Sequence, residues 1–268
     1  MTRVLRTILG VGILLTYTVP LFWLVVTSIK PNQDVVARSA SLVFTPTLEG
    51  YRSAIAQGVL GSAVSTILIA AMTVAGCLLL GLPTAYGLAQ SRSRLVPVGL
   101  ALLIILQMMP QTATLIPLYQ VLGSWGLLGG MSGLVVADIA MMLPFTVILL
   151  RPFSAAVPPQ LEEAAALDGA SRIRTFVWIV LPVVRNGVMT VAILVFILIS
   201  GEFLYAVNFL TDPSQYPLSA TVAQQVSQYG ISWSTLMAIA VIASIPTLIV
   251  FAVGQRALVR GISLGAVK

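Results

Sequence analysis

Long runs of hydrophobic residues alternate with short polar or charged segments along the chain. A helix that crosses the hydrocarbon core of a bilayer needs about 20 apolar residues, and six segments reach this length. We predict membrane-crossing helices over residues 7–29, 61–88, 98–122, 131–150, 183–210 and 233–258. The apolar run of the first segment is longer than a signal-peptide core of about 7–15 residues, so we interpret it as an uncleaved span.

The composition supports a membrane protein. Of the 268 residues, 58% are hydrophobic and 8% are charged, whereas a soluble domain carries about 25% charged residues. So few charges could not cover the surface of a water-soluble protein, and lipid must therefore contact most of it. We predict an all-α polytopic fold with six transmembrane helices, arranged as a single domain over residues 1–268.

The basic residues predict the orientation of the spans, because Lys and Arg concentrate in cytoplasmic loops. With the N-terminus in the cytoplasm, eleven of the 14 basic residues lie inside: Arg3, Arg6, Arg92, Arg94, Arg151, Arg172, Arg174, Arg185, Arg256, Arg260 and Lys268. The outer loops hold Lys30, Arg38 and Arg52. We therefore expect both termini in the cytoplasm. We attribute the net charge of +6 to this asymmetry and predict no nucleic-acid partner.

The reactive side chains exclude several classes of chemistry. The chain has one cysteine, Cys77, and no histidine. It can therefore form no internal disulfide and no histidine-based triad, and we predict no metal site. The sequence also has no GxxxxGK[ST] phosphate loop. We predict that any ATP dependence comes from a partner and that this chain has no catalytic site or cofactor of its own.

Proline and polar residues disturb several predicted spans. Proline removes a helix hydrogen bond and kinks the chain, which a bilayer tolerates only where protein or water satisfies the freed carbonyl groups. The third span is the most disturbed, because residues 107–112 place Gln107, Pro110 and Gln111 near membrane depth. Transporters line their pathways with such broken helices. Proline is also common in ordinary membrane helices, so both interpretations stay open.

Two acidic residues fall within predicted spans, Asp138 in the fourth and Glu202 in the outer half of the fifth. A charged group is costly in lipid and usually faces the protein interior. We favour a structural pairing with a neighbouring subunit for Asp138 and a place along a polar pathway for Glu202. The opposite role stays open for each.

The segment between the fourth and fifth spans, about residues 158–182, predicts a helix–turn–helix on the cytoplasmic face. Two prolines can open its first helix, and the two acidic residues that follow suit the positive end of the helix dipole. Gly169 then allows the chain to turn, and Ser171 can cap a second helix. The next span is expected to begin at Pro182.

This segment resembles the EAA loop of ABC-importer permeases. The family pattern is Glu-Ala-Ala, three residues, Gly, nine residues, Ile, one residue and Leu-Pro. Its fixed positions are filled here by Glu163, Ala164, Ala165, Gly169, Ile179, Leu181 and Pro182. Other segments are similar to the carbohydrate-uptake subgroup, above all to the smaller six-span permease of the maltose-importer type: residues 28–31, 46–51, 109–119 and 255–268.

The resemblance implies a type I ABC-importer permease fold and half of the translocation pathway for a sugar or oligosaccharide, in a bacterial plasma membrane. The implied partners are a second, larger permease, two ATPase subunits that hold ATP and Mg²⁺, and an extracytoplasmic substrate-binding protein. The residues implied to couple to the ATPase are Glu162, Glu163, Ala164, Ala165, Leu167, Asp168, Gly169 and Arg172. The C-terminal residues implied to contact the ATPase pair are Leu264, Gly265, Val267 and Lys268.

Two further sets of residues follow from the same resemblance. The expected pathway or substrate contacts are Met109, Gln111, Glu202, Tyr205 and Asn208. The expected contacts to the binding protein are Asp212, Gln215, Tyr216, Gln225 and Tyr229. The same polar and aromatic side chains suit an ordinary solvated loop equally well, so both interpretations stay open. Residues 200–203 depart from the family, which commonly has an aromatic residue and an acidic or amide pair there. This departure weakens the transfer of a substrate role to Glu202.

Other functions stay open from the sequence. A permease of the same superfamily for a polyol, a glycerol phosphodiester or an amino acid would have the same spans and loop. A six-span half of a secondary transporter would use acidic residues such as Asp138 and Glu202 for ion coupling and would lack a loop matched to an ATPase. An intramembrane enzyme would need a nucleophile–base pair, and the sequence presents no convincing one.

Overall fold

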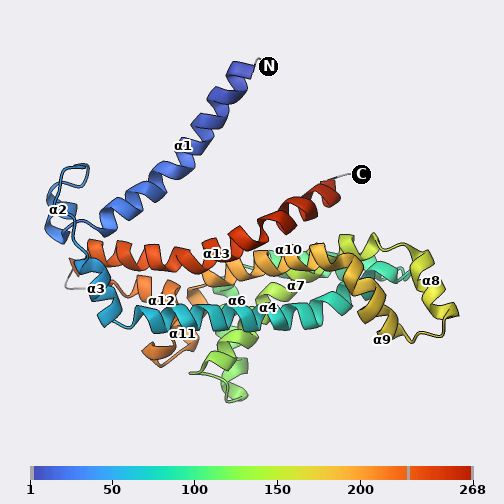
Figure 1. Ribbon diagram of the computed structural model, residues 1–268. Coiled ribbons are helices and arrows are strands. Elements are labelled where there is room, and N and C mark those ends of the chain that lie inside the picture. The colour runs from blue at the N-terminus through green and yellow to red at the C-terminus, as the bar shows by residue number, and fades with distance from the viewer. Residues whose placement is uncertain (1–2, 228–229, 267–268) are drawn as a thin grey trace. The chain divides into compact units, whose positions relative to one another are not determined.

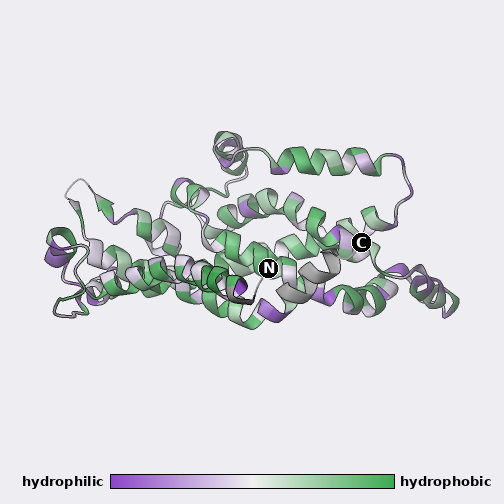
Figure 2. Cartoon of the chain, turned by 90° about the horizontal axis from the view of Figure 1, so that it is seen from above, coloured by the Kyte–Doolittle hydropathy of each residue, from purple (hydrophilic) through white to green (hydrophobic). Residues whose placement is uncertain are grey.

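The computed structural model describes residues 3–227 and 230–266. Its long helices are predominantly hydrophobic, and hydrophilic residues concentrate in the connecting segments (Figure 2). The chain divides into two compact units, a first unit (Met1–Ser65 and Tyr216–Pro246) and a second unit (Thr66–Gln215 and Thr247–Lys268). Two of the three boundaries along the chain fall inside long helices, α4 (Val59–Gln90) and α13 (Trp233–Ala266), and the third falls after Gln215. The expectation of a single domain stays a prediction.

One further long helix, three short helices and one strand pair complete the first unit. They are α1 (Arg3–Ser28), α2 (Asn32–Ala37), α3 (Glu49–Ala56), α12 (Leu218–Ala223), β1 (Val226–Ser227) and β2 (Gly230–Ile231), the two strands being antiparallel. A small core of Ala54, Val59, Leu218 and Ile239 unites α3, α4, α12 and α13. Burial of this apolar surface stabilises the first unit.

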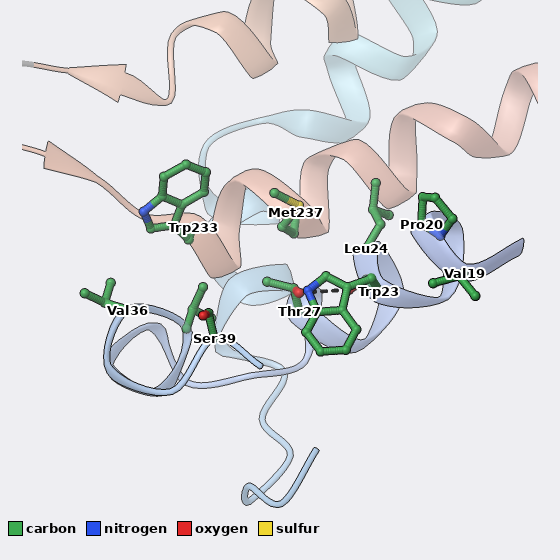
Figure 3. Close-up of a pocket in the computed structure, with 10 residues that line it drawn as sticks. Val19, Pro20, Trp23, Leu24, Thr27, Val36, Ser39, Trp233 and Met237 are labelled. Carbon is green, nitrogen blue, oxygen red and sulfur yellow. Dashed lines mark hydrogen bonds between the residues drawn. The ribbon is translucent and has the colours of Figure 1, made fainter. Parts of the chain in front are cut away.

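The first helix, α1, is apolar and is exposed from Leu5 to Phe22, whereas Val26, Thr27 and Ser28 at its C-terminal end are buried. Near its C-terminal end, an apolar groove of about 800 Å³ lies between α1 and α13, where Trp23 and Leu24 lie opposite Met237 (Figure 3). The side chain of Lys30 stabilises the chain segment that follows α1. Its buried Nζ donates to the Ser39 carbonyl oxygen at 2.9 Å and lies over the Trp23 ring at 5.3 Å.

The second unit holds the remaining helices. They are α5 (Val96–Gln107), α6 (Gln111–Ser124), α7 (Met131–Ala155), α8 (Pro159–Leu167), α9 (Arg172–Thr175), the π-helical turn η1 (Phe176–Val180), α10 (Leu181–Ser200), α11 (Leu204–Phe209) and the 3-10 turn η2 (Pro213–Gln215). The central helix is α7, which packs against α5, α6, α10 and α11. Glycine permits close packing of α4 against α7, because an added Cβ at Gly76 would meet the Ile139 side chain at 2.3 Å.

The prediction of six membrane spans is confirmed when the bent pair α5–α6 counts as one span beside five long apolar helices. The pair bends by 97°, so the third span is broken rather than kinked. Pro110 stands at the break and has no N–H group with which to continue the hydrogen-bond ladder of α5.

The predicted bounds of the fifth span, residues 183–210, are wrong at both ends. The helix starts at Arg172 and continues through η1 to Ser200. Pro182 does not start the span, because it is the second residue of α10 and the π-helical turn η1 ends directly before α10. Past Ser200 the chain leaves the helix and starts again as α11, so Glu202 lies at a break and not inside a helix.

Candidate functional site

The helix–turn–helix predicted over residues 158–182 is present as α8 and α9, beyond the C-terminal end of α4 in the second unit (Figure 1). The first helix begins at Pro159, as predicted. Gly169 has φ +77°, a left-handed conformation that favours glycine. The Ser171 hydroxyl accepts the Arg174 N–H at 3.4 Å and caps α9, which confirms the predicted turn and cap.

The two acidic residues of α8 have different surroundings. Glu162 is partly buried, and its Oε1 accepts a hydrogen bond from Gln90 Nε2 at 2.7 Å, which joins α8 to the last turn of α4. The Tyr86 ring lies 5.3 Å from the Phe176 ring and makes a second contact near the same place. Glu163 is exposed. The sequence reasoning missed Gln90, although a polar residue that ends a long apolar span is a recognisable signal.

Most of the expected coupling residues are accessible. Ala165 is buried and Glu162 is partly buried, whereas the exposed members are Glu163, Ala164, Leu167, Asp168, Gly169 and Arg172. Large apolar side chains are exposed beside them, with Leu167 at 89%, Ile173 at 78% and Trp178 at 75%. Exposed apolar side chains on a polar loop are typical of a surface that another protein covers. Ile173 and Trp178 were not singled out from the sequence.

The C-terminal residues of the expected tail contact are only partly within the described structure. Leu264 and Gly265 belong to the helical backbone of α13. Val267 and Lys268 lie outside the described residues. The role of the tail stays a prediction.

A second candidate region is the break in the third span. A cavity of about 360 Å³ lies at the bend, and its polar lining residues are Gln107, Gln111, Thr114 and Tyr205. Apolar side chains such as Met109 and Met142 complete the lining. Three of the five residues expected along a pathway therefore share one cavity. Thr114, which the sequence reasoning missed, follows Gln111 by three residues and so lies on the same face of α6.

Glu202 organises the polar side of this region. Its carboxylate accepts hydrogen bonds from Gln111 Nε2 at 2.8 Å, from the Tyr205 N–H at 2.7 Å and from the Ala206 N–H at 3.1 Å. The two backbone donors are in the first turn of α11, whose N–H groups have no partner within the helix. The Tyr205 hydroxyl also bonds to the Thr114 hydroxyl. Glu202 thus links α11 to α6, the second helix of the broken third span.

Two other predicted residues behave differently. Asn208 is exposed, and its side chain donates to the Leu204 carbonyl oxygen at 2.7 Å, so it does not line the cavity.

Asp138 in α7 is fully buried, and neither carboxylate oxygen has a hydrogen-bond partner among the described residues. The expected structural pairing of Asp138 with a neighbouring subunit stays a prediction. The described residues also bring together no group of three or more His, Cys, Asp or Glu side chains that could hold a metal.

The residues expected to contact a binding protein belong to both units. In the second unit, Asp212 is exposed, and the Ser214 backbone N–H lowers the pKa of its carboxyl group. Gln215 accepts the Met131 N–H at 3.2 Å. In the first unit, Tyr216 is partly buried and Gln225 donates to Gln57 at 2.8 Å. Tyr229 lies outside the described residues.

Known proteins match this chain over most of its length. The family described as "Binding-protein-dependent transport system inner membrane component" matches residues 77–264. The probable ABC transporter permease protein y4oR of Sinorhizobium fredii is 30% identical over 99% of this chain and 96% of its own. The diacetylchitobiose uptake system permease protein DasC of Streptomyces coelicolor is 30% identical over 99% of this chain and 97% of its own.

A further relative is the galactooligosaccharides transport system permease protein GanQ of Bacillus subtilis, 29% identical over 93% of this chain and 89% of its own. Among solved structures, a bacterial ABC transporter involved in the import of the acidic polysaccharide alginate has a chain with a TM-score of 0.80. That chain is 20% identical, and the match covers 96% of this chain and 98% of that one. The structural likeness confirms the predicted fold.

Proposed function

Because the chain belongs to the family of binding-protein-dependent transport system inner membrane components, we propose that it is one of two permease subunits of an ATP-driven importer for a sugar or oligosaccharide. The similarity to permeases named for diacetylchitobiose and galactooligosaccharide transport supports this class of solute. Because the chain belongs to this family, we do not retain the alternative of a secondary-transporter half, a class of protein that has no ATPase partner.

The observation that carries the proposal is the exposed helix–turn–helix of α8 and α9. A short helix that fits a cleft of an ATPase can transmit the motion of that ATPase as a rigid lever. The exposed Glu163 can form a charge-assisted hydrogen bond with a basic residue of the ATPase, while Leu167, Ile173 and Trp178 supply apolar contact area. Glu162 transmits the motion further, since it is bonded to the end of α4.

The cavity at the broken third span is this subunit's contribution to the pathway. Its polar side chains can exchange hydrogen bonds with hydroxyl groups of a solute, and its apolar side chains can contact the C–H faces of a sugar ring. Broken helices at membrane depth occur where they line a cavity. Met109, Gln111 and Tyr205 are the residues that we assign to it.

The remaining parts of the importer are supplied by partners. A second, larger permease completes the pathway, an extracytoplasmic binding protein delivers the solute, and two ATPase subunits bind ATP and Mg²⁺. Hydrolysis therefore takes place outside this chain. The distribution of Lys and Arg supports cytoplasmic termini and a cytoplasmic position for α8 and α9.

Purification of the chain from its own membrane in mild detergent tests the proposal. We expect a second permease and an ATPase to co-purify, and we expect ATP hydrolysis by the complex to be lost when Glu163 is replaced by alanine. The matched control is Glu49→Gln, which removes an exposed acidic side chain from the first unit and should leave hydrolysis unchanged. A pure monomer or homodimer without an ATPase would overturn the proposal.

The orientation predicts a specific labelling pattern. The variant Gln225→Cys, in a Cys77→Ala background, should react with a membrane-impermeant maleimide in intact cells. The variant Leu167→Cys, at a position where the leucine is 89% exposed, should react only after the membrane is permeabilised. The reverse pattern would show that the topology is inverted.

A further inference from the structure

The hydrogen bonds around the cavity at the broken span determine which polar atoms it offers to a solute. All of its lining residues are uncharged. A side-chain amide can turn either its NH₂ group or its oxygen outward, and a hydroxyl group can donate or accept. The bonds that such groups make within the protein therefore decide what remains for the solute. On the α6 side of the cavity, this applies to Gln111 and Thr114.

Glu202 determines the orientation of the Gln111 amide. Its two carboxylate oxygens accept the backbone N–H groups of Tyr205 and Ala206, so both oxygens act as acceptors. Gln111 must therefore turn its NH₂ group toward Glu202, and Nε2 donates to Glu202 Oε1 at 2.8 Å. The other end of the amide, Gln111 Oε1, is left for the cavity. This oxygen is not one of the buried side-chain atoms that lack a partner in the described part of the chain, so a solute can reach it.

The single hydrogen of the Thr114 hydroxyl is used within the protein. It is donated to the backbone carbonyl oxygen of Gln111 at 2.9 Å. The Thr114 oxygen also bonds to the Tyr205 hydroxyl, and Tyr205 must be the donor in that bond because Thr114 has no second hydrogen. Tyr205 is fully buried, whereas Thr114 is partly exposed and lines the cavity. Thr114 can therefore offer a solute only a lone pair of its oxygen.

We propose that the α6 side of the cavity is an acceptor face, formed by Gln111 Oε1 and Thr114 Oγ1, that selects solutes with free hydroxyl groups. The inference rests on the proposed function, in which the cavity lines the solute pathway, and it adds the feature by which the solute is recognised. Glu202 is a positioning residue, since it acts on the solute through Gln111. A sugar hydroxyl donates to the acceptor face. An O-methyl or fluoro substituent can only accept, so it leaves the acceptor face unpaired, and a site of this kind rejects it.

Two neutral thiol reagents test the acceptor face without knowledge of the natural solute. Met109→Cys in a Cys77→Ala background places a thiol in the cavity, because Met109 lines it and is 47% exposed. The purified complex in proteoliposomes is treated with hydroxyethyl or methoxyethyl methanethiosulfonate. The first reagent carries a hydroxyl donor, and the second carries only an ether acceptor. Each rate is divided by the rate of the same reagent with free cysteine in solution.

We expect the corrected rate of the hydroxyethyl reagent to exceed that of the methoxyethyl reagent by about fivefold, the effect of one hydrogen bond. Gln111→Met and Thr114→Val should each lower this ratio, whereas Thr114→Ser, which keeps the hydroxyl, should preserve it. Glu202→Ala should lower it as well, although Gln111 remains, because the amide is then free to turn. A general change in access to the cavity alters both rates and cancels in the ratio.

Gln107 provides the matched control. It lines the same cavity from the end of α5, and its amide oxygen is buried without a hydrogen-bond partner among the described residues. Only the amide nitrogen is then left to the cavity, and both reagents can accept a hydrogen bond from it. Gln107→Leu should therefore leave the ratio unchanged.

The outcomes separate this inference from the proposed function. Equal corrected rates, or a ratio that both Gln111→Met and Thr114→Val leave unchanged, would overturn the acceptor face and leave the pathway intact. Because Glu202→Ala also removes the bonds to the first turn of α11, these two variants keep the test decisive. If neither reagent reaches the cysteine from either side during ATP turnover, the cavity is not part of an aqueous pathway, and the proposed role of the broken span fails together with the acceptor face.

Discussion

Replacing Gly169 by proline is expected to abolish solute uptake while the chain still inserts and the permease pair still assembles. Gly169 has φ +77°, whereas a proline ring fixes φ near −65°. The substitution also removes the N–H that donates to the Ala166 carbonyl oxygen at 3.1 Å. The turn between α8 and α9 cannot then form, and α8, the proposed coupling helix, loses its position.

The expected loss of uptake is at least about tenfold, the effect of losing about 1.4 kcal/mol of docking free energy. Uptake is measured in proteoliposomes, and insertion is measured by membrane fractionation of the same preparations. The matched control is Gly169→Asn, because asparagine tolerates the left-handed conformation better than other residues. Failure of the proline variant to insert would show that this turn is a folding element and not a coupling element.

Replacing Gly50 by alanine is expected to destabilise the first unit strongly. Gly50 lies in α3, where an added Cβ would stand 2.7 Å from the Ser234 carbonyl oxygen and 2.8 Å from its carbonyl carbon. These are backbone atoms at the start of α13, so a rotamer change cannot relieve the clash. Overpacking of this kind costs about 1–3 kcal/mol, and we expect the midpoint of thermal unfolding to fall by about 5 °C.

Gly61 provides the matched control for this experiment. It lies in α4, also in the first unit, and an added Cβ there would meet no atom within 4 Å. Alanine is favoured over glycine in a helix interior by roughly 0.5–1 kcal/mol, so Gly61→Ala should preserve or raise the midpoint. Equal midpoints for Gly50→Ala and the parent chain would show that the approach of α3 to α13 is not tight.

Local features of the sequence were sufficient for the class of protein, the number of spans and the helix–turn–helix of α8 and α9. Span number follows from the length of apolar runs, because every membrane helix must satisfy its own backbone within a fixed thickness. The turn at Gly169 and the cap at Ser171 depend on residues within one or two turns of each other, so their spacing along the chain predicts them. The disturbed third span was also recognisable, since its proline breaks the helix locally.

The tertiary structure alone decided which side chains meet. Glu202 receives its bond from Gln111, a residue 91 positions away, and Glu162 bonds to Gln90, 72 positions away. The sequence predicts Glu202 inside a membrane span. The structure instead places it between α10 and α11, where it accepts hydrogen bonds from the first turn of α11 and from Gln111 of α6. Such pairs depend on how separate helices pack against each other. Helix packing is determined by the shapes of the side chains on both sides of the interface, and the hydrophobic periodicity of a single helix does not predict them.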